Sequence, residues 1–224
     1  MTEPLAELLA GLPVELPDDP LPIFRNWFDA AAASQSMTNP DAMTVATVAD
    51  VDRVTARVVL CKEIVADPGY LVFFTNYDSA KGQQILTNAN VAAVFYWDAL
   101  GRQVRVEGIA CQSPEAESER YFASRDRDSQ IGAWTSEQSR SISSHQALLD
   151  KHAQTQRRFG AQESDDSIAR PPHWGGYRIG IRAIELWQQG AARLHDRARW
   201  ERHLEQTDPA GFRAGPWQTT RLQP

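Results

Sequence analysis

Large apolar residues first recur at helical spacing over residues 22–34. The positions that repeat every three or four residues are Ile23, Phe24, Trp27, Phe28 and Ala31. This spacing predicts an amphipathic helix. In front of it, five prolines alternate with acidic residues, which is typical of a poorly ordered terminus. We therefore expect a flexible N-terminal segment over residues 1–20 and a single domain over residues 21–224.

Five stretches in the middle of the chain are short, apolar and rich in β-branched or aromatic side chains, the pattern of β-strands. They are Ala42–Val48, Val54–Cys61, Tyr70–Thr75, Val91–Trp97 and Gln103–Cys111. One helix interrupts them, over Ala80–Leu86 with Ser79 as its N-cap. Because the strands follow one another closely with few long crossovers, the pattern favours an antiparallel barrel or sandwich over a parallel sheet.

The rest of the chain predicts helices first and strands last. Residues 113–160 are mostly helical in pattern, with a final helix that Ser144 caps and Gly160 closes. Residues 161–172 are polar and then proline-rich, which indicates a loop. The tail predicts strands at Tyr177–Arg182, Ile184–Gln188, Arg193–Trp200 and Trp217–Leu222.

The composition is that of one soluble domain: 224 residues, of which 42% are hydrophobic and 23% charged. The formal net charge of −6 argues against a general nucleic-acid binder, whose affinity depends on neutralising phosphates. No apolar run approaches the roughly 20 residues of a membrane helix, and the acidic N-terminus lacks the basic region of a signal peptide. Two cysteines without a CxxC motif exclude a disulfide framework and a zinc ribbon. A reducing, cytoplasmic location is expected.

Two charged regions are candidates for ligand binding. Residues 124–134 are dense in Arg, Ser and Gln, and an Arg fork matches phosphate oxygens bidentately. Composition alone favours a solvated loop whose Arg and Asp residues pair with one another. Around a predicted turn, strand alternation would place Arg193, His195 and Arg197 on one face. Taken alone, this second region is better interpreted as an exposed, salt-bridged hairpin.

A third candidate group contains Arg57 and Lys62 on one predicted strand, and Ser79 and Lys81 at the next helix start. A helix N-terminus with neighbouring cations is suited to binding an anion. A spacing of five places Arg57 and Lys62 on opposite faces of a regular strand, so they serve different anions or lie where the strand ends. Ordinary surface lysines are the alternative. No two histidines have metal-ligand spacing, and the dinucleotide, NTP-binding and hydrolase motifs are absent.

In these same regions the chain resembles the pyridoxine/pyridoxamine 5′-phosphate oxidase family, over about residues 21–224. The matching stretches are Arg57–Lys62, Phe73–Asn76, Ser79–Lys81, Arg102–Val104, Tyr121-Phe122, Ser129–Trp134, Gln138-Ser139, Trp174–Gly176, Trp187-Gln188, Arg193–Arg197 and Arg221–Pro224. Each stretch is a weak motif alone, but the order and spacing match throughout. Their conjunction favours ligand-binding roles over the surface interpretations given above.

The resemblance implies a mainly β fold with peripheral helices, the antiparallel, Greek-key-like FMN-binding split barrel. It implies a homodimer with FMN at the subunit interface and a C-terminal dimerisation and substrate region at about residues 174–224. It also implies oxidation of pyridoxine or pyridoxamine 5′-phosphate, which are small phosphorylated pyridines, to pyridoxal 5′-phosphate. Molecular oxygen would reoxidise the flavin and give hydrogen peroxide. No metal, nucleic acid or membrane partner is expected.

The resemblance also assigns residue roles by position. Arg57 and Lys81 would hold the FMN phosphate. The rest of FMN would be lined by Val58, Val59, Leu60, Cys61, Lys62, Phe74, Thr75, Gln103, Gln138, Ser139, Trp187 and Arg197. The substrate phosphate would be held by Lys62, Tyr121, Arg125 and Ser129. Arg193 and His195 would cover the substrate ring opposite the flavin as catalytic residues.

The chain departs from the family pattern at three places. Ala80 stands where a basic residue usually precedes the lysine, and Asn39 stands where a carboxylate is common. Nothing in residues 1–20 matches the Arg-rich, Tyr-containing segment that closes over the substrate in many members. Two alternatives stay open: an oxidase of another aromatic amine or a dihydrophenazine-type compound, and a non-catalytic FMN or pyridoxal phosphate binding protein. The intact substrate-binding and ring-covering residues argue against both.

Overall fold

The computed structural model describes residues 12–160, 167–207 and 210–224. Its five described helices are α2 (Leu21–Ala33), α3 (Ala80–Thr87), α4 (Glu115–Ala123), α5 (Arg127–Thr135) and α6 (His145–Phe159). The described strands are β1 (Ala42–Asp50), β2 (Arg53–Leu60), β3 (Glu63–Val65), β4 (Tyr70–Asn76), β5 (Asn90–Trp97), β6 (Arg102–Gln112), β7 (Trp174–Gln188), β8 (Asp196–Glu201), β9 (Leu204–Gln206), β10 (Phe212–Ala214) and β11 (Gln218–Leu222). The 3-10 turns η1 (Asp98–Leu100) and η2 (Ala191–Arg193) complete the described elements.

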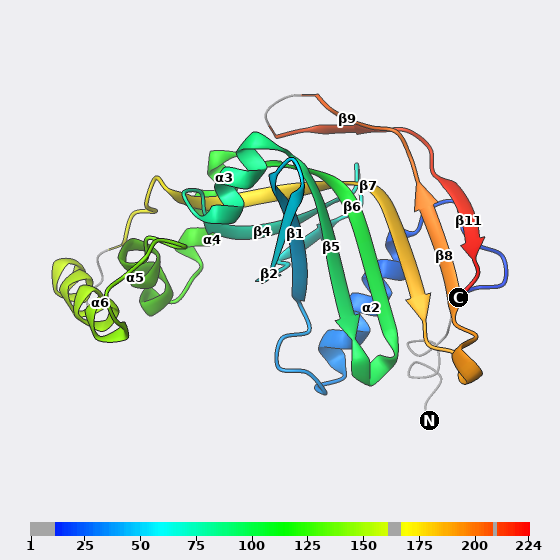
Figure 1. Cartoon of the computed structure of the whole chain (residues 1–224), viewed down its shortest axis with the longest axis horizontal. Coiled ribbons are helices and arrows are strands. Elements are labelled where there is room, and N and C mark those ends of the chain that lie inside the picture. Colours follow the sequence, from blue (N-terminus) through cyan, green and yellow to red (C-terminus); the bar gives the residue numbers. More distant parts are fainter. Residues whose placement is uncertain (1–11, 161–166, 208–209) are drawn as a thin grey trace.

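Nine of the described strands form one antiparallel sheet. Its order is β11-β8-β7-β6-β5-β1-β2, with β4 also paired to β7 and β3 paired to β4, while β9 and β10 form a separate hairpin. Figure 1 shows α5 and α6 at one end of the molecule and β8 and β11 at the other. The mainly antiparallel architecture with peripheral helices is therefore confirmed, although the path of paired strands runs from β11 to β2 without closing into a ring.

The long strand β7 links the two halves of the sheet. One edge of β7 pairs with β6, whereas the other edge pairs first with β4 and then with β8. The change of partner occurs at a bulge, where Arg182 has no partner in β6. Opposite this bulge, a Cβ on Gly108 would lie 1.9 Å from the carbonyl oxygen of Gly180, so glycine is required for the close approach. The two strands predicted over residues 177–188 are thus one continuous strand, and the predicted break at residue 183 lies beside the bulge.

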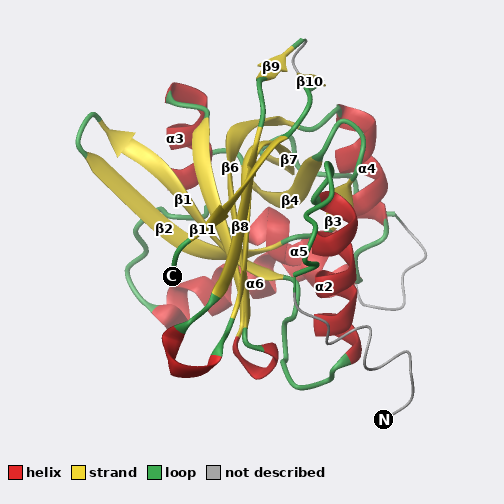
Figure 2. Ribbon diagram, turned by 90° about the vertical axis from the view of Figure 1, so that its right-hand side faces the viewer, coloured by secondary structure: helices red, strands yellow, loops and turns green. Residues whose placement is uncertain are grey.

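Helix α2 provides much of the core on one side of the sheet. Its buried residues have the predicted helical spacing and are Leu21, Phe24, Trp27, Ala30 and Ala31. The Phe24 ring meets the Phe95 ring of β5 edge-on, with centroids 5.4 Å apart. In Figure 2 the sheet is seen nearly edge-on, with α2 to one side of it. The predicted amphipathic helix is therefore present and packs through its apolar face.

Residues 12–20, which belong to the expected flexible N-terminal segment, contact the rest of the fold in the structure. Leu12 is buried and belongs to the main hydrophobic core. The carbonyl oxygen of Pro17 accepts a hydrogen bond of 2.8 Å from Nε1 of Trp200. Leu12 and Leu16 therefore pack against the main core, and the Pro17 contact joins this segment to β8, although prolines prevent a regular element there. The remainder of the expected flexible segment, residues 1–11, lies outside the described residues.

The connection between β7 and β8 also differs from the prediction. Gln188 pairs with Asp196, so residues 189–195 form the connection rather than part of a strand. Within it, Ala192 and Arg193 have positive φ angles of 53° and 64°. The predicted strand over residues 193–200 is therefore wrong at its start. Of the three residues predicted to share a strand face, only the last, Arg197, lies on β8.

The remaining sequence predictions concern caps and short elements. Ser79 and Ser144 cap α3 and α6 as predicted, each accepting a hydrogen bond from a backbone amide of the first turn. Strands β3, β9 and β10 were missed because a stretch of three residues is too short to show an alternating pattern. Among the helices that the structure describes, none combines the length and apolar composition that crossing a membrane requires.

Candidate functional site

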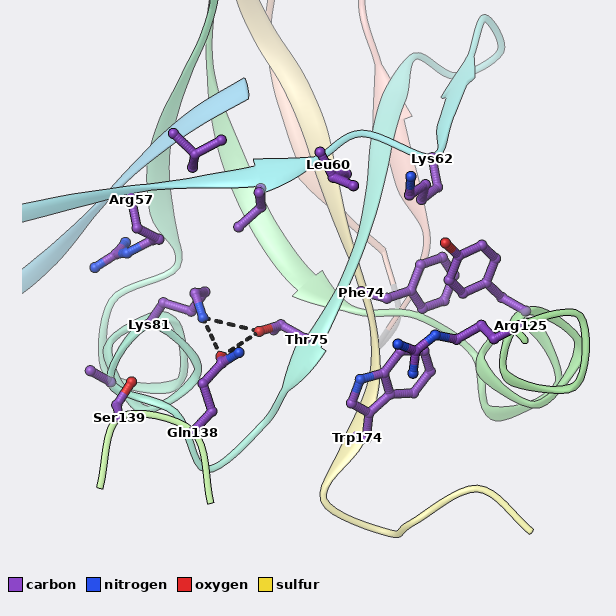
Figure 3. Close-up of a pocket in the computed structure, with 14 residues that line it drawn as sticks. Arg57, Leu60, Lys62, Phe74, Thr75, Lys81, Arg125, Gln138, Ser139 and Trp174 are labelled. Atoms are coloured by element: carbon purple, nitrogen blue, oxygen red, sulfur yellow. Dashed lines mark hydrogen bonds between the residues drawn. The ribbon is translucent and has the colours of Figure 1, made fainter. Parts of the chain in front are cut away.

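One cavity of about 660 Å³ gathers most of the predicted ligand-binding residues. Its lining comes from β2, β4, the start of α3, the region around α4, the loop after α5 and the start of β7. The lining residues are Arg57, Val58, Val59, Leu60, Lys62, Phe74, Thr75, Ala80, Lys81, Tyr121, Arg125, Gln138, Ser139 and Trp174. Figure 3 shows two groups of basic side chains on its two sides, Arg57 with Lys81 and Lys62 with Arg125.

Lys81 is a buried cation whose hydrogen-bond acceptors, among the residues that the structure describes, are all neutral. Its Nζ donates to Oε1 of Gln138 at 2.5 Å, to Oγ1 of Thr75 at 3.0 Å and to Oγ of Ser79 at 3.3 Å. Burial lowers the pKa of Lys81 to about 8, and the positive charge of nearby Arg57 adds to this lowering. A buried cation without a counter-charge is costly, so this position favours a bound anion.

Arg57 lies beside Lys81 and is also held by neutral acceptors. Its guanidinium donates to the Oγ1 atoms of Thr47 and Thr55, both at 2.6 Å, and burial lowers its pKa. Within the described residues, the hydrogen-bond partners of Arg57 and Lys81 include no carboxylate. Two converging cations without an acid fit the phosphate group of a cofactor such as FMN.

The loop after α5 places Gln138 and Ser139 on the cavity beside these cations. Ser139 has a φ of 72°, a left-handed conformation that costs energy in a residue with a Cβ. Oε1 of Gln138 accepts from both Thr75, at 2.9 Å, and Lys81, and Figure 3 shows this triangle of hydrogen bonds. The strained backbone is thus held at the cavity wall by polar contacts.

The opposite side of the cavity is aromatic and carries a second cation. The rings of Phe74 and Tyr121 are stacked with centroids 3.9 Å apart, and Trp174 lies nearly parallel to both. The guanidinium carbon of Arg125 lies 4.8 Å from the centroid of the Trp174 ring. Burial lowers the pKa of Arg125, and its buried Nη1 has no hydrogen-bond partner within the described residues. An unsatisfied guanidinium of this kind is suited to a second anionic group.

Lys62 lines the same side but has a carboxylate partner. β2 ends at Leu60, so the regular alternation stops before Lys62. Arg57 and Lys62 therefore both face one cavity, which agrees with the expectation that they lie where the strand ends. Nζ of Lys62 lies 2.7 Å from Oδ2 of Asp41, and both side chains are partly exposed. To hold a ligand phosphate, Lys62 would have to share or leave this exposed ion pair.

Cys61 and Ser129 are predicted site residues that do not line this cavity. Cys61 is 1% exposed, belongs to the core and donates from Sγ to the carbonyl oxygen of Glu63 at 3.4 Å. Burial raises the pKa of its thiol to about 12. The backbone amide of Ser129 donates to the N-cap carboxylate of Asp126, in the first turn of α5. Cys61 directly follows the end of β2 and is buried in the core, whereas the position of Ser129 depends on how α5 packs.

The other predicted residues lie at the far end of β7. They are Gln103, Trp187, Arg193, His195 and Arg197. Gly176 pairs with Phe74 at the cavity, and Trp187 follows eleven residues later along β7. That separation is roughly 36 Å of extended strand. One chain therefore does not bring the two predicted halves of the site together.

The second group is itself well ordered by polar contacts. The Trp187 and His195 rings lie 4.6 Å apart. The backbone amide of Gly190 donates to Nδ1 of His195 at 3.2 Å, which leaves Nε2 to carry the ring proton. Nη2 of Arg197 pairs with the buried Oε1 of Glu185 at 2.8 Å. Arg193, at the end of η2, is exposed.

Sequence reasoning missed some residues at the cavity. Trp174 was part of a matching stretch but received no role, and its stacking depends on contacts between distant segments. Ala80, noted only as a departure, lines the cavity wall. Asp41, the partner of Lys62, also received no role. Within the described residues, no group of three or more His, Cys, Asp or Glu side chains is placed to hold a metal ion.

Known proteins are similar in sequence to this chain over nearly its whole length. Residues 30–158 match the family model described as pyridoxamine 5′-phosphate oxidase, and residues 174–224 match the one described as pyridoxine 5′-phosphate oxidase C-terminal dimerisation region. A pyridoxine/pyridoxamine 5′-phosphate oxidase of Burkholderia mallei is 46% identical over 206 residues, covering 92% of this chain and 89% of that protein. Its namesake from Cupriavidus metallidurans is 42% identical with the same coverage.

Two solved structures support the fold. PhzG from Burkholderia lata, solved with tetrahydrophenazine-1-carboxylic acid, superposes with a TM-score of 0.78 at 24% identity and covers 96% of this chain and 100% of its own. A pyridoxamine 5′-phosphate oxidase-related, FMN-binding protein from Nostoc punctiforme gives a TM-score of 0.65 at 15% identity, covering 90% of this chain and 97% of its own. These likenesses confirm the split-barrel class expected from the sequence.

Proposed function

The chain belongs to the pyridoxamine 5′-phosphate oxidase family, and on that premise we propose that it oxidises pyridoxine 5′-phosphate and pyridoxamine 5′-phosphate to pyridoxal 5′-phosphate. Its cofactor is FMN, molecular oxygen is the electron acceptor and hydrogen peroxide is the second product. The observation that carries the proposal is the pair of cationic groups on the two sides of one cavity. Two phosphorylated molecules lying together, cofactor and substrate, require two such groups.

In this proposal, Arg57 and Lys81 bind the FMN phosphate. Lys81 is buried and Arg57 is partly buried, and within the described residues neither has a carboxylate among its hydrogen-bond partners. The N-terminus of α3 adds its own attraction for an anion. Gln138 and Ser139 complete this side of the cavity. The departure at Ala80 leaves one cation fewer than the family pattern, but Arg57 and Lys81 alone match the charge of a phosphate dianion.

Arg125, Tyr121 and Lys62 bind the substrate phosphate on the other side. The unpartnered Nη1 of Arg125 supports this role. Because its guanidinium already lies against the Trp174 ring, Arg125 is held in place before the ligand arrives. Preorganisation of this kind reduces the entropy lost on binding.

The second half of the site, at the far end of β7, has to come from a partner chain. The match of residues 174–224 to a dimerisation region supports a homodimer. We infer that Gln103, Trp187 and Arg197 of one chain contact the FMN held by the other, and that Arg193 and His195 cover the substrate ring. The length of β7 between the two groups supports this division.

FMN supplies the chemistry of accepting a hydride from the substrate carbon and passing the electrons to oxygen. Overall, the carbon loses a hydride and its hydroxyl or amino group loses a proton, and these reduce oxygen to hydrogen peroxide. The imine formed from an amine then takes up water and releases ammonia. The chain itself positions the substrate ring, excludes water and places the positive charge of Arg193 near the reacting group. Nε2–H of His195 is available to donate a hydrogen bond to the substrate.

The proposal is tested by incubating the purified protein, loaded with FMN, with each substrate in air and measuring pyridoxal 5′-phosphate and peroxide. A reduced phenazine precursor is a third arm, and non-phosphorylated pyridoxine is the control for the phosphate. Equal amounts of aldehyde and peroxide from the phosphorylated substrates alone support the proposal. Peroxide from the phenazine precursor alone would favour the second oxidase reading. Tight pyridoxal phosphate binding without turnover would identify a binding protein.

A further inference from the structure

Gln84 lies on α3 behind Arg57 and accepts three hydrogen bonds at one atom. Its Oε1 is 2.5 Å from Oγ1 of Thr47, 2.9 Å from Oγ1 of Thr55 and 3.3 Å from Nη2 of Arg57. Gln84 does not line the cavity. It therefore reaches the anion site only through the residues in front of it.

The hydrogen bonds around Gln84 have a defined direction. Arg57 donates from Nη1 to the hydroxyl of Thr47 and from Nη2 to the hydroxyl of Thr55. Each hydroxyl, having accepted from the guanidinium, uses its own proton to donate to Gln84. The guanidinium plane is thus fixed by two short chains that end on the same carbonyl oxygen.

The acceptor that ends these chains is neutral. Other arginines of the sheet are oriented by carboxylates, as Arg197 is by Glu185 and Arg199 is by Glu107. A carboxylate would orient Arg57 equally well but would also neutralise it. An amide orients the guanidinium and leaves its charge available to a ligand.

We propose that Gln84 is a positioning residue that orients Arg57 without neutralising it, and thereby sets the preference of the site for a phosphorylated over a non-phosphorylated flavin. The inference rests on the proposed binding of the FMN phosphate by Arg57 and Lys81. Gln84 itself touches neither cofactor nor substrate, so it acts through Arg57 alone.

The test compares the affinity of flavin-free protein for FMN and for riboflavin, which has the same ring without the phosphate. Flavin fluorescence quenching measures both, so no turnover is needed. Gln84→Glu keeps the side-chain shape and adds a carboxylate beside Arg57, and Gln84→Met removes the acceptor without adding charge. Gln83→Glu is the matched control, because Gln83 is the exposed neighbour on the same helix and the change in net charge is identical.

Gln84→Glu is expected to weaken FMN binding by roughly tenfold or more, the loss of a charge-assisted contact, with riboflavin affinity changed less than about twofold. Gln84→Met should lower the ratio of FMN affinity to riboflavin affinity by a smaller factor, and Gln83→Glu should leave this ratio unchanged. In an Arg57→Ala background, Gln84→Glu should have no further effect. Thermal unfolding of each variant checks that it is folded.

Three outcomes would overturn the inference. Equal losses for FMN and riboflavin would show that Gln84 serves only the fold. A full effect of Gln84→Glu without Arg57 would show direct repulsion of the phosphate. An effect of Gln83→Glu as large as that of Gln84→Glu would show a general charge effect. If Arg57→Ala and Lys81→Ala also leave the FMN-to-riboflavin ratio unchanged, the proposed phosphate position itself is wrong.

Discussion

Raising the pH above about 8 is expected to weaken FMN binding through Lys81. The pKa of this buried amine is lowered to about 8 by burial and by the charge of Arg57. In the flavin-free protein, about nine in ten Lys81 side chains are then charged at pH 7, about one in ten at pH 9 and about one in a hundred at pH 10. A phosphate dianion binds the charged form, so binding at high pH must first return a proton to Lys81.

The size of the effect follows from the same contact. Above pH 8 the apparent affinity should fall about tenfold per pH unit, until the contribution of the Lys81 contact is lost. A hydrogen bond to a charged group contributes about 1.5–3 kcal/mol, which is about ten- to a hundredfold in affinity. Between pH 7 and pH 10 we therefore expect a fall within that range. The guanidinium of Arg57 stays charged throughout, so binding is weakened and not abolished.

The assay is a titration of flavin-free protein with FMN at each pH, followed by flavin fluorescence. Riboflavin is the ligand control, because it contains every titrating group of the ring and no phosphate. Lys81→Arg is the protein control, because its side chain stays charged and should give a flat profile. If FMN affinity falls equally in Lys81→Arg, or if riboflavin shows the same fall, the titrating group is not Lys81 and the reasoning is refuted.

Three further predictions address other parts of the molecule. Arg125→Ala should raise the substrate KM by about ten- to a hundredfold while changing FMN affinity less than about twofold; equal losses of both would make Arg125 structural. Arg193→Ala should slow the reduction of bound flavin in stopped-flow experiments by about 10²–10³-fold, with partial rescue by Lys, and normal reduction at saturating substrate would contradict a catalytic role. Gly108→Ala should cost about 3 kcal/mol or more of unfolding free energy in urea, because its Cβ would meet a backbone oxygen at 1.9 Å. Gly132→Ala is the control, because a Cβ there would have nothing within 4 Å, and the free energy of unfolding should not fall. A loss of stability in this control would show that helix α5 is disturbed.

The fold was predictable from sequence wherever burial of one face makes apolar residues recur at a regular spacing. β-strand alternation and the spacing of Phe24 and Trp27 both follow from one face being packed against the core. The prediction failed where pairing between distant strands decides the outcome. No local pattern predicts that β7 continues past Arg182, because its continuity depends on the pairing of β6 with residues 177–188. The late start of β8 at Asp196 likewise depends on register with β7.

The candidate site was predictable only in part, and largely through the resemblance. Spacing alone marked Arg57, Lys62 and Lys81 as cations near a helix start, with no means of deciding between a ligand site and a solvated surface. The structure adds the missing fact, which is that the hydrogen-bond partners of Arg57 and Lys81 are neutral. Gln84 carries no sequence signature, since a glutamine on a polar helix is unremarkable until its partners are known.

The length of β7 has a consequence for genetics. If each site combines the cavity of one chain with the far end of β7 from the other, a defect at Lys81 and a defect at Arg193 lie in different halves of every site. A dimer formed from one chain of each kind then has one site with both defects and one with neither. Random pairing of equal amounts makes half of the dimers mixed, so about a quarter of all sites would be intact. Two alleles that are each inactive alone would therefore complement one another when expressed together.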